Sequence, residues 1–362
     1  MVDDDDRPAW AEDLLAAARA AGEDAAAALR LAADYGVQLP LPGQGRTATR
    51  WRLLAEVSAC DLTAGRILEA HSDALAILAE AGADENGTGA DRRHSTWGVF
   101  AAEAPGARLD AESDGAGHVL RGTKPWCSLG ERLDRALVTA HAGEQRQLFA
   151  VDLHHPSVRA EPPSGWVARG LRNVPSGPVH FDATPARAVG ARGWYLTRPG
   201  FAWGGMGVAA CWYGAAQALG RALRPALARR EGELAALHAG IVDVALHAAA
   251  CVLASAAGEI DSGQARGAAG ELLALRVRAV VADTAEQVLA QVGHALGPAP
   301  LAFDEEHARR VADLQLYVRQ HHAERDLATL GSAVLHDGQP VSELASEPMG
   351  TATSSRPTKE AE

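Results

Sequence analysis

Two side chains near the middle of the chain are of types that could hold a flat conjugated ring. Trp126 and Ser128 lie two residues apart in a run that follows a Gly-Thr-Lys turn and reads as a strand, Leu120-Arg121-Gly122-Thr123-Lys124-Pro125-Trp126-Cys127-Ser128. On a strand, residues i and i+2 point to the same side. One face would then offer an indole to cover a ring and a hydroxyl to bind its edge, as a flavin requires.

The alternative for these residues is structural. Trp126 could belong to the core and Ser128 to a turn. A core strand seldom carries a Trp and a Ser on one face, however, because a buried hydroxyl needs a hydrogen-bond partner. The surrounding sequence has to decide between the two interpretations.

Composition excludes several classes of function. The 362 residues carry a formal net charge of −12, and no cluster of Lys and Arg with aromatic residues offsets it, so we expect no nucleic-acid partner. The four cysteines are far apart and lack metal-ligand spacing, which predicts reduced thiols and no metal site. The acidic N-terminus does not resemble a secretion signal, and no run reaches the roughly 18 apolar residues of a membrane span. We therefore expect a soluble, cytoplasmic protein.

The spacing of apolar residues divides the chain into helical and β parts. Leucines and alanines at spacings of three and four predict a helical N-terminal domain over residues 8–95, with a polar, Gly-rich linker at its end. Short apolar alternations between Gly, Pro and Asp turns predict a β domain over 96–195. Helical spacing returns over 196–336 and predicts a bundle of three or four long helices. Residues 337–362 are rich in Ser, Thr, Pro and Glu, and we expect them to be disordered.

This order of helix, β and helix resembles the acyl-CoA dehydrogenase family over roughly residues 10–331. The run Gly122-x-Lys124-x-Trp126-Cys127-Ser128 is similar to the family's Gly-x-Lys-x-Trp-Ile-Thr. Ala102 to Ala107 is similar to its Thr-Glu-Pro-Gly-Ala strand, with Ala102 where Thr is usual. Further similar segments follow in the family's order: Asp134 to Ala140, Gly170-Leu171-Arg172, Val179-x-Phe181-Asp182 and Gly207 to Ala210. The resemblance implies an α+β fold with an N-terminal helical domain, a middle β-barrel or sandwich domain and a C-terminal helical bundle.

The resemblance also implies a cofactor and partners. Members bind FAD between the β domain and the bundle, with Trp126 against the flavin ring and Ser128 at its N5/O4 edge. Cys127 and Ala102 would complete the cofactor-binding positions. The implied reaction oxidises an acyl-CoA-type thioester and passes electrons to an electron-transferring flavoprotein. Homodimers or tetramers are usual in this family.

The catalytic carboxylate of the family has no counterpart here. When the last helical region is aligned on Asp313 and Tyr317, His321 falls at the position of the base. A neutral imidazole could serve as the base. Flavin monooxygenases of this fold also carry His in this region, and a third possibility is that His321 and His322 make ordinary hydrogen bonds near a helix end. The family's segment that binds the ADP part of FAD is missing as well. At the corresponding place this chain is shorter and reads Arg229-Arg230-Glu231-Gly232-Glu233.

The leading hypothesis is an FAD-dependent acyl-CoA dehydrogenase-like oxidoreductase with hydride transfer from the substrate Cβ to flavin N5. Two alternatives stay open. One is a non-catalytic partner subunit that pairs with a second, complete dehydrogenase chain. The other is a flavin-dependent monooxygenase of the same fold.

Overall fold

The computed structural model describes residues 7–83, 95–162 apart from 114 and 116, 165–228 and 232–336. Four helices come first: α1 (Ala11–Ala21), α2 (Ala25–Tyr35), α3 (Thr47–Cys60) and α4 (Leu62–Glu80), with the short 3-10 helix η2 (Gly36–Gln38) after α2. The break between α3 and α4 lies at Asp61. Its side chain accepts hydrogen bonds from the backbone N–H groups of Thr63 and Ala64, which caps α4.

The middle of the chain forms a barrel of strands. The strands are β1 (Trp97–Phe100), β2 (Leu109–Ser113), β3 (His118–Ser128), β4 (Arg135–Ala142), β5 (Gln145–Asp152), β6 (Val158–Ala160) and β7 (Ser176–Val189). Their order is β1-β4-β2-β3-β7-β5, and an additional pairing of β4 with β5 closes the ring, while β6 pairs with β7. Closure gives hydrogen-bond partners to backbone N–H and C=O groups that would be unpaired at the edges of an open sheet.

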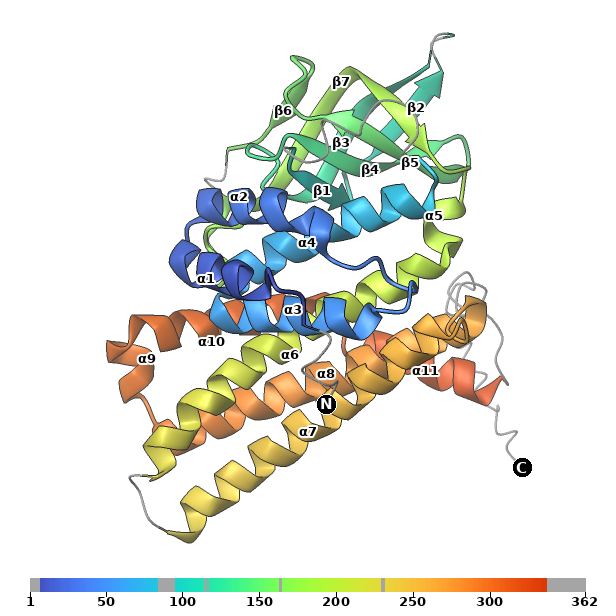
Figure 1. The fold of residues 1–362 in the computed structure, drawn as a ribbon. Helices are drawn as coiled ribbons and strands as arrows, with labels where there is room; N and C mark the ends of the chain where they lie inside the picture. Colours follow the sequence, from blue (N-terminus) through green and yellow to red (C-terminus); the bar gives the residue numbers. More distant parts are fainter. Residues whose placement is uncertain are drawn as a thin grey trace, which may run out of the picture.

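The C-terminal part is helical. It contains α5 (Trp194–Thr197), α6 (Pro199–Ala228), α7 (Glu233–Asp261), α8 (Gly267–Leu296), α9 (Ala299–Phe303), α10 (Glu305–Tyr317), the 3-10 helix η5 (Val318–Gln320) and α11 (Glu324–Leu335). Figure 1 shows the barrel lying on α2, α4 and α5, with the long helices α6, α7 and α8 on the opposite side of the N-terminal helices. The expected α+β fold with helical ends and a middle β domain is confirmed.

Close approach of α6 to α3 holds the helical parts together. A Cβ on Gly214 would lie 2.0 Å from the carbonyl oxygen of Ala55, so only glycine permits the two backbones to pack at this distance. The side chains around this contact are buried, including Leu54, Trp212 and Ala215. The large apolar core of the protein therefore continues from the N-terminal helices into the C-terminal bundle.

The barrel is tied to the helices by specific contacts. The backbone N–H of Leu171 donates to the Asp313 carboxylate at 2.5 Å, which joins the segment before β7 to α10. Gly170 next to it leaves no room for a side chain, because a Cβ would lie 2.0 Å from the carbonyl oxygen of Ala312. His71 on α4 is buried, and its Nδ1 accepts from the backbone N–H of Trp97 at the start of β1.

Two sequence expectations fall wholly or mostly outside the described residues, namely the disordered tail at 337–362 and the linker around residues 83–94. Within the described residues, α7 is long and apolar enough to cross a membrane by length and composition alone. Its most apolar stretch has a mean hydropathy of 1.8, and 28% of that stretch is buried.

Candidate functional site

Trp126 is presented to the outside by a β-bulge. Between Lys124 and Cys127 the register of β3 against β7 shifts, so that three steps along β3 match two along β7. Lys124 and Pro125 are both buried, Trp126 is 59% exposed, and Cys127 is buried. The regular alternation expected from sequence therefore fails at Pro125 and resumes beyond Trp126, where the inward-facing Cys127 separates Trp126 from Ser128.

The backbone of Trp126 is strained. Its φ is 57°, in the left-handed region that bulky residues rarely adopt. Such a conformation costs on the order of 1–3 kcal/mol and is found most often at functional sites. Because the indole is mostly exposed, packing in the core does not account for this backbone conformation.

The Ser128 hydroxyl, two residues after Trp126, pairs with the hydroxyl of Ser176. The oxygens of Ser128 and Ser176 are 2.8 Å apart, and Ser176 donates in turn to the carbonyl oxygen of Val174 at 3.3 Å. Since each hydroxyl has one proton, Ser128 donates to Ser176 when Ser176 donates to Val174. The Ser128 oxygen then keeps a lone pair that can accept a hydrogen bond from an N–H group of a ligand.

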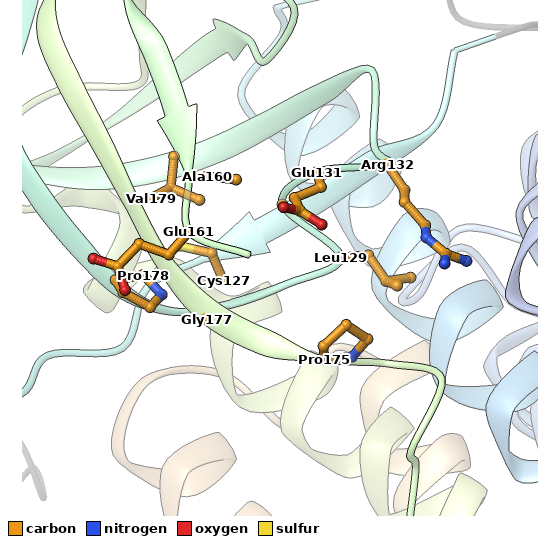
Figure 2. A pocket seen from close by; sticks show the side chains of 11 residues that line it. Cys127, Leu129, Glu131, Arg132, Ala160, Glu161, Pro175, Gly177, Pro178 and Val179 are labelled. Carbon is orange, nitrogen blue, oxygen red and sulfur yellow. The ribbon is translucent and has the colours of Figure 1, made fainter. Parts of the chain in front are cut away.

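A cavity of about 40 Å³ lies at the end of β3 (Figure 2), and neither Trp126 nor Ser128 lines it. It is lined by side chains from β3, β6 and β7, among them Cys127, Ala160 and Val179, and by the turn at Glu131 and Arg132. Cofactor pockets usually measure roughly 300–1,000 Å³. This cavity is too small for a flavin ring.

Ala102, the fourth expected cofactor-binding position, is exposed between β1 and β2. Its methyl group offers no hydrogen bond. The neighbouring Glu103 accepts from the buried Lys124 ammonium group at 2.6 Å, and Lys124 also donates to Thr139 at 2.9 Å. Partial burial raises the pKa of Glu103, but the ammonium and nearby Arg146 outweigh burial and hold that pKa below its usual value. This ion pair anchors the β1–β2 connection to β3 close to the bulge.

His321 lies in the helical part, at the junction of η5 and α11. Its side chain is 9% exposed, and its buried Nε2, 3.8 Å from Asp326, makes no hydrogen bond to any residue that the structure describes. Burial lowers the pKa of His321 below 6.5, and the nearby Arg278 guanidinium lowers it further, whereas Asp326 raises it. The imidazole is therefore neutral at neutral pH.

Asp326, the carboxylate that faces His321, is already engaged. It accepts from the backbone N–H of His322 at 3.1 Å and contacts Nδ1 of the same residue at 3.2 Å. Within the described residues, no hydrogen bond or ion pair joins His321 to Trp126 or Ser128. The structure thus groups Trp126, Cys127 and Ser128 and places His321 on a separate element.

A buried group of charged residues on α4 was not anticipated from sequence. Glu69 accepts from Arg66 at 3.0 Å and from the Tyr317 hydroxyl at 3.3 Å. Burial raises the pKa of Glu69 from 4.5 to about 7, and nearby Asp73 raises it further, while Arg66 and Arg50 lower it. Glu69 can therefore gain or lose a proton near neutral pH.

Glu69 and Asp73 line a second cavity, of about 10 Å³, together with Arg50 and the glycines Gly204 and Gly207 of α6. This space is about that of one water molecule. Two carboxyl groups and a guanidinium suit a water or a small polar group and disfavour a hydrocarbon chain. Arg50 is held in place by donating to the Pro40 carbonyl oxygen and to the Ser72 hydroxyl.

A sequence signal for this group exists. Arg66, Glu69 and Asp73 are spaced three and four residues apart inside an otherwise apolar helix, which places all three on one face. Charged residues at core positions need buried partners. Tyr317, by contrast, is 248 residues from Glu69 and could not be identified as its partner from spacing.

Comparison with known proteins identifies the fold. No family model and no curated protein matches the chain. Among solved structures, KijD3 in complex with FMN and dTDP-3-amino-2,3,6-trideoxy-4-keto-3-methyl-D-glucose matches with a TM-score of 0.74 and 18% identity, over 92% of this chain and 95% of that one. TdsC from Paenibacillus sp. A11-2 with FMN and indole matches with a TM-score of 0.76 and 16% identity, over 91% and 97%.

The methanesulfinate monooxygenase MsuC from Pseudomonas fluorescens matches with a TM-score of 0.74 and 15% identity, over 91% of this chain and 97% of that one. The three matches span nearly the whole of both chains in each case. At this level of identity they establish the fold of the chain.

Proposed function

We propose that the protein is a flavin-dependent monooxygenase that binds FMN. The observation that carries this proposal is His321, a neutral imidazole whose buried Nε2 has no hydrogen-bond partner among the described residues. The resemblance aligns it with the position of the carboxylate base that a thioester dehydrogenase requires. Because Asp326 is bound to His322, it does not replace the missing carboxylate. The names of the similar structures support the proposal, since two describe FMN complexes and a third describes a monooxygenase.

The exposed indole of Trp126 and the hydroxyl pair of Ser128 and Ser176 fit a flavin ring. Trp126 would cover one face of the ring, and the Ser128 oxygen would accept from an N–H at its edge. The shortened segment around residues 229–233 favours FMN over FAD, because the resemblance assigns to that segment the contacts with the ADP part. FMN has no ADP part to hold.

When bound, reduced flavin supplies two electrons to dioxygen, so that one oxygen atom enters the substrate and the other leaves as water. His321 would hold or transfer a proton at Nε2, the nitrogen that has no hydrogen-bond partner among the described residues. Burial of its side chain keeps the imidazole away from bulk water and neutral. The acyl-CoA substrate and the electron-transferring flavoprotein that the resemblance implies would have no part in this reaction.

The proposal is tested with purified full-length protein. We expect it to bind added FMN more tightly than FAD, measured by quenching of flavin fluorescence. With chemically reduced FMN and oxygen, amines and reduced-sulfur compounds should be screened for oxygenated products by mass spectrometry. Anaerobic bleaching of the bound flavin by acyl-CoA esters would overturn the proposal in favour of a dehydrogenase.

A chain that binds neither FMN nor FAD would overturn it in a different way. The protein would then be the non-catalytic partner subunit, and flavin should bind only after a second dehydrogenase-like chain is added. The two negative results are distinguishable, because the first requires a bound flavin and the second excludes it.

A further inference from the structure

Arg278 on α8 connects α6 to the turn that carries His321. The helices α6 and α8 run side by side in the bundle (Figure 1). One guanidinium N–H of Arg278 donates to the Gly205 carbonyl oxygen on α6 at 2.8 Å, and another donates to the Gln320 carbonyl oxygen at the end of η5 at 2.7 Å. Gln320 is the residue directly before His321. A single side chain therefore joins the backbone of α6 to the backbone beside the imidazole.

The guanidinium of Arg278 also covers an aromatic ring. Its carbon Cζ lies 4.9 Å from the centre of the Trp212 ring on α6. A planar group that makes two hydrogen bonds and this ring contact at the same time has a well-defined orientation. The ammonium group of a Lys at this position could not reproduce the combination, because it is not planar and does not form a fork.

The charge of Arg278 is not neutralised by an ion pair with any carboxylate in the described part of the chain. Its side chain is only partly exposed, and buried charges are usually paired because their desolvation is costly. Burial lowers the pKa of Arg278, and nearby Asp326 raises it without restoring the usual value. An arginine side chain nevertheless stays protonated. Its donors are used to fix two backbone carbonyl groups, which is a positioning role.

The turn between η5 and α11 needs to be held in place. Ala323 has a φ of 46°, in the left-handed region that residues with a Cβ rarely adopt. Such a backbone persists only where the surrounding structure fixes it. On the C-terminal side of the turn, Asp326 accepts a hydrogen bond from the backbone N–H of His322 at 3.1 Å. Arg278 holds the N-terminal side through Gln320.

We propose that Arg278 is a positioning residue for His321, because it fixes the turn that carries the imidazole against α6 and α8. No hydrogen bond within the described residues holds Nε2 of His321, so the backbone of the turn determines where this nitrogen lies. The proposal deepens the monooxygenase function proposed above and rests on it, since the placement serves catalysis only if His321 transfers a proton.

The imidazole of His321 is faced by groups from α8, α11 and the turn before α11. Burial has the largest effect and lowers the pKa of His321. Asp326 on α11 raises it, Arg278 on α8 lowers it, His322 in the turn lowers it, and Glu286 on α8 raises it. Removal of the Arg278 charge should therefore raise the pKa of His321.

Two substitutions separate the position of the imidazole from the charge beside it. Arg278→Lys keeps the positive charge but loses the paired hydrogen bonds, whereas Arg278→Met removes both. Arg276→Met is the matched control, because Arg276 lies on the same helix and is exposed. All three variants are compared with wild type as full-length proteins without added flavin.

The first measurement is the rate at which diethyl pyrocarbonate modifies His321 at about pH 8, where the imidazole is neutral. Peptide mass spectrometry identifies the modified residue. We expect the rate at His321 to rise about tenfold or more in Arg278→Lys and in Arg278→Met, because a lost hydrogen bond to a charged group lets the turn open more often. The rate in Arg276→Met should equal that of wild type.

The second measurement is the titration of His321 by NMR with isotope-labelled histidine. The signal of His321 is identified by its absence in His321→Gln. Its midpoint should rise in Arg278→Met and rise less in Arg278→Lys, which keeps the charge. A residue that only joined helices would not change this midpoint.

Unchanged modification and titration of His321 in folded Arg278→Met would overturn the proposal, whatever reaction the protein catalyses. A loss of stability in urea without either change would overturn it too. If Arg278→Met does not fold, the modification rate in Arg278→Lys decides the question in the same way. If the His321 measurements change as expected but wild type with FMN shows no oxygen-dependent turnover, the proposed function fails and the placement of His321 by Arg278 stands.

Discussion

The Tyr317 hydroxyl donates to the Glu69 carboxylate at 3.3 Å, although the two residues are 248 positions apart in the chain. The contact joins the last turn of α10 to the middle of α4. Both side chains are buried, and Tyr317 also packs edge-on against Trp212 of α6. Three helices from the two helical parts of the chain therefore meet at one buried carboxyl group.

Glu69 should make the stability of the protein depend on pH. Its pKa rises from 4.5 to about 7 on folding, so the folded chain binds the proton more tightly than the unfolded chain. The resulting stabilisation is present below about pH 4.5 and is lost as the pH rises through about 7. Glu69→Gln cannot titrate. Its free energy of unfolding should therefore rise relative to wild type by about 2–3 kcal/mol between about pH 5 and pH 8, as measured by urea denaturation.

The matched control for this measurement is Glu12→Gln, which removes a carboxyl group whose side chain is 69% exposed. It should leave the wild-type pH dependence in place. Equal pH profiles for Glu69→Gln and wild type would show that Glu69 is ionised in the folded protein throughout this range.

Gly170→Ala should destabilise the joint between the barrel and α10. The new Cβ would lie 2.0 Å from the Ala312 carbonyl oxygen, and both groups are fixed in the backbone. Relief would require the segment before β7 to move, which would also stretch the hydrogen bond from Leu171 to Asp313. We expect a loss of about 1–3 kcal/mol in the free energy of unfolding. Gly165→Ala, where nothing lies near the added Cβ, should cost far less, and equal losses would contradict this interpretation.

Trp126→Ala should weaken flavin binding without destabilising the fold. The side chain is 59% exposed, so its removal leaves the core unchanged. Ring stacking contributes ~0.5–1.5 kcal/mol beyond the burial of area, and about 1.4 kcal/mol corresponds to tenfold in affinity. We expect the Kd for FMN to rise about tenfold or more in a fluorescence titration. Phe303→Ala, which removes a more exposed aromatic side chain from α9, should leave the Kd unchanged; a similar effect from both would show that Trp126 has no special role.

His321→Ala should reduce turnover while flavin stays bound. A positioned acid or base contributes about 10²–10⁴-fold to a rate, and a loss in this range is expected. Because burial lowers the pKa of His321 below 6.5, wild-type activity should be present at neutral pH and fall only as the pH drops further. His322→Ala changes the adjacent, 61% exposed imidazole and should retain most activity. Unchanged turnover in His321→Ala would exclude it as the proton-transferring group.

The sequence by itself determined the order of the elements and suggested one part of the proposed site. Helical and strand periodicities are local properties, and they predicted the helical ends and the middle β domain. The motif around Trp126 and Ser128 was likewise visible, because its residues are neighbours in the chain. The i and i+2 rule, however, gave no warning of the bulge, which arises from the pairing of β3 with β7.

Only the tertiary structure decided the exposure of Trp126 and the direction in which the pKa values of Glu69 and His321 shift. The left-handed backbone and exposure of Trp126 follow from the register shift with a strand about 50 residues later. The high pKa of Glu69 follows from burial beneath helices that come much later in the chain, and the low pKa of His321 from burial and from packing near Arg278. Desolvation and charge interactions depend on distances in space, and the spacing of residues along a chain does not contain them.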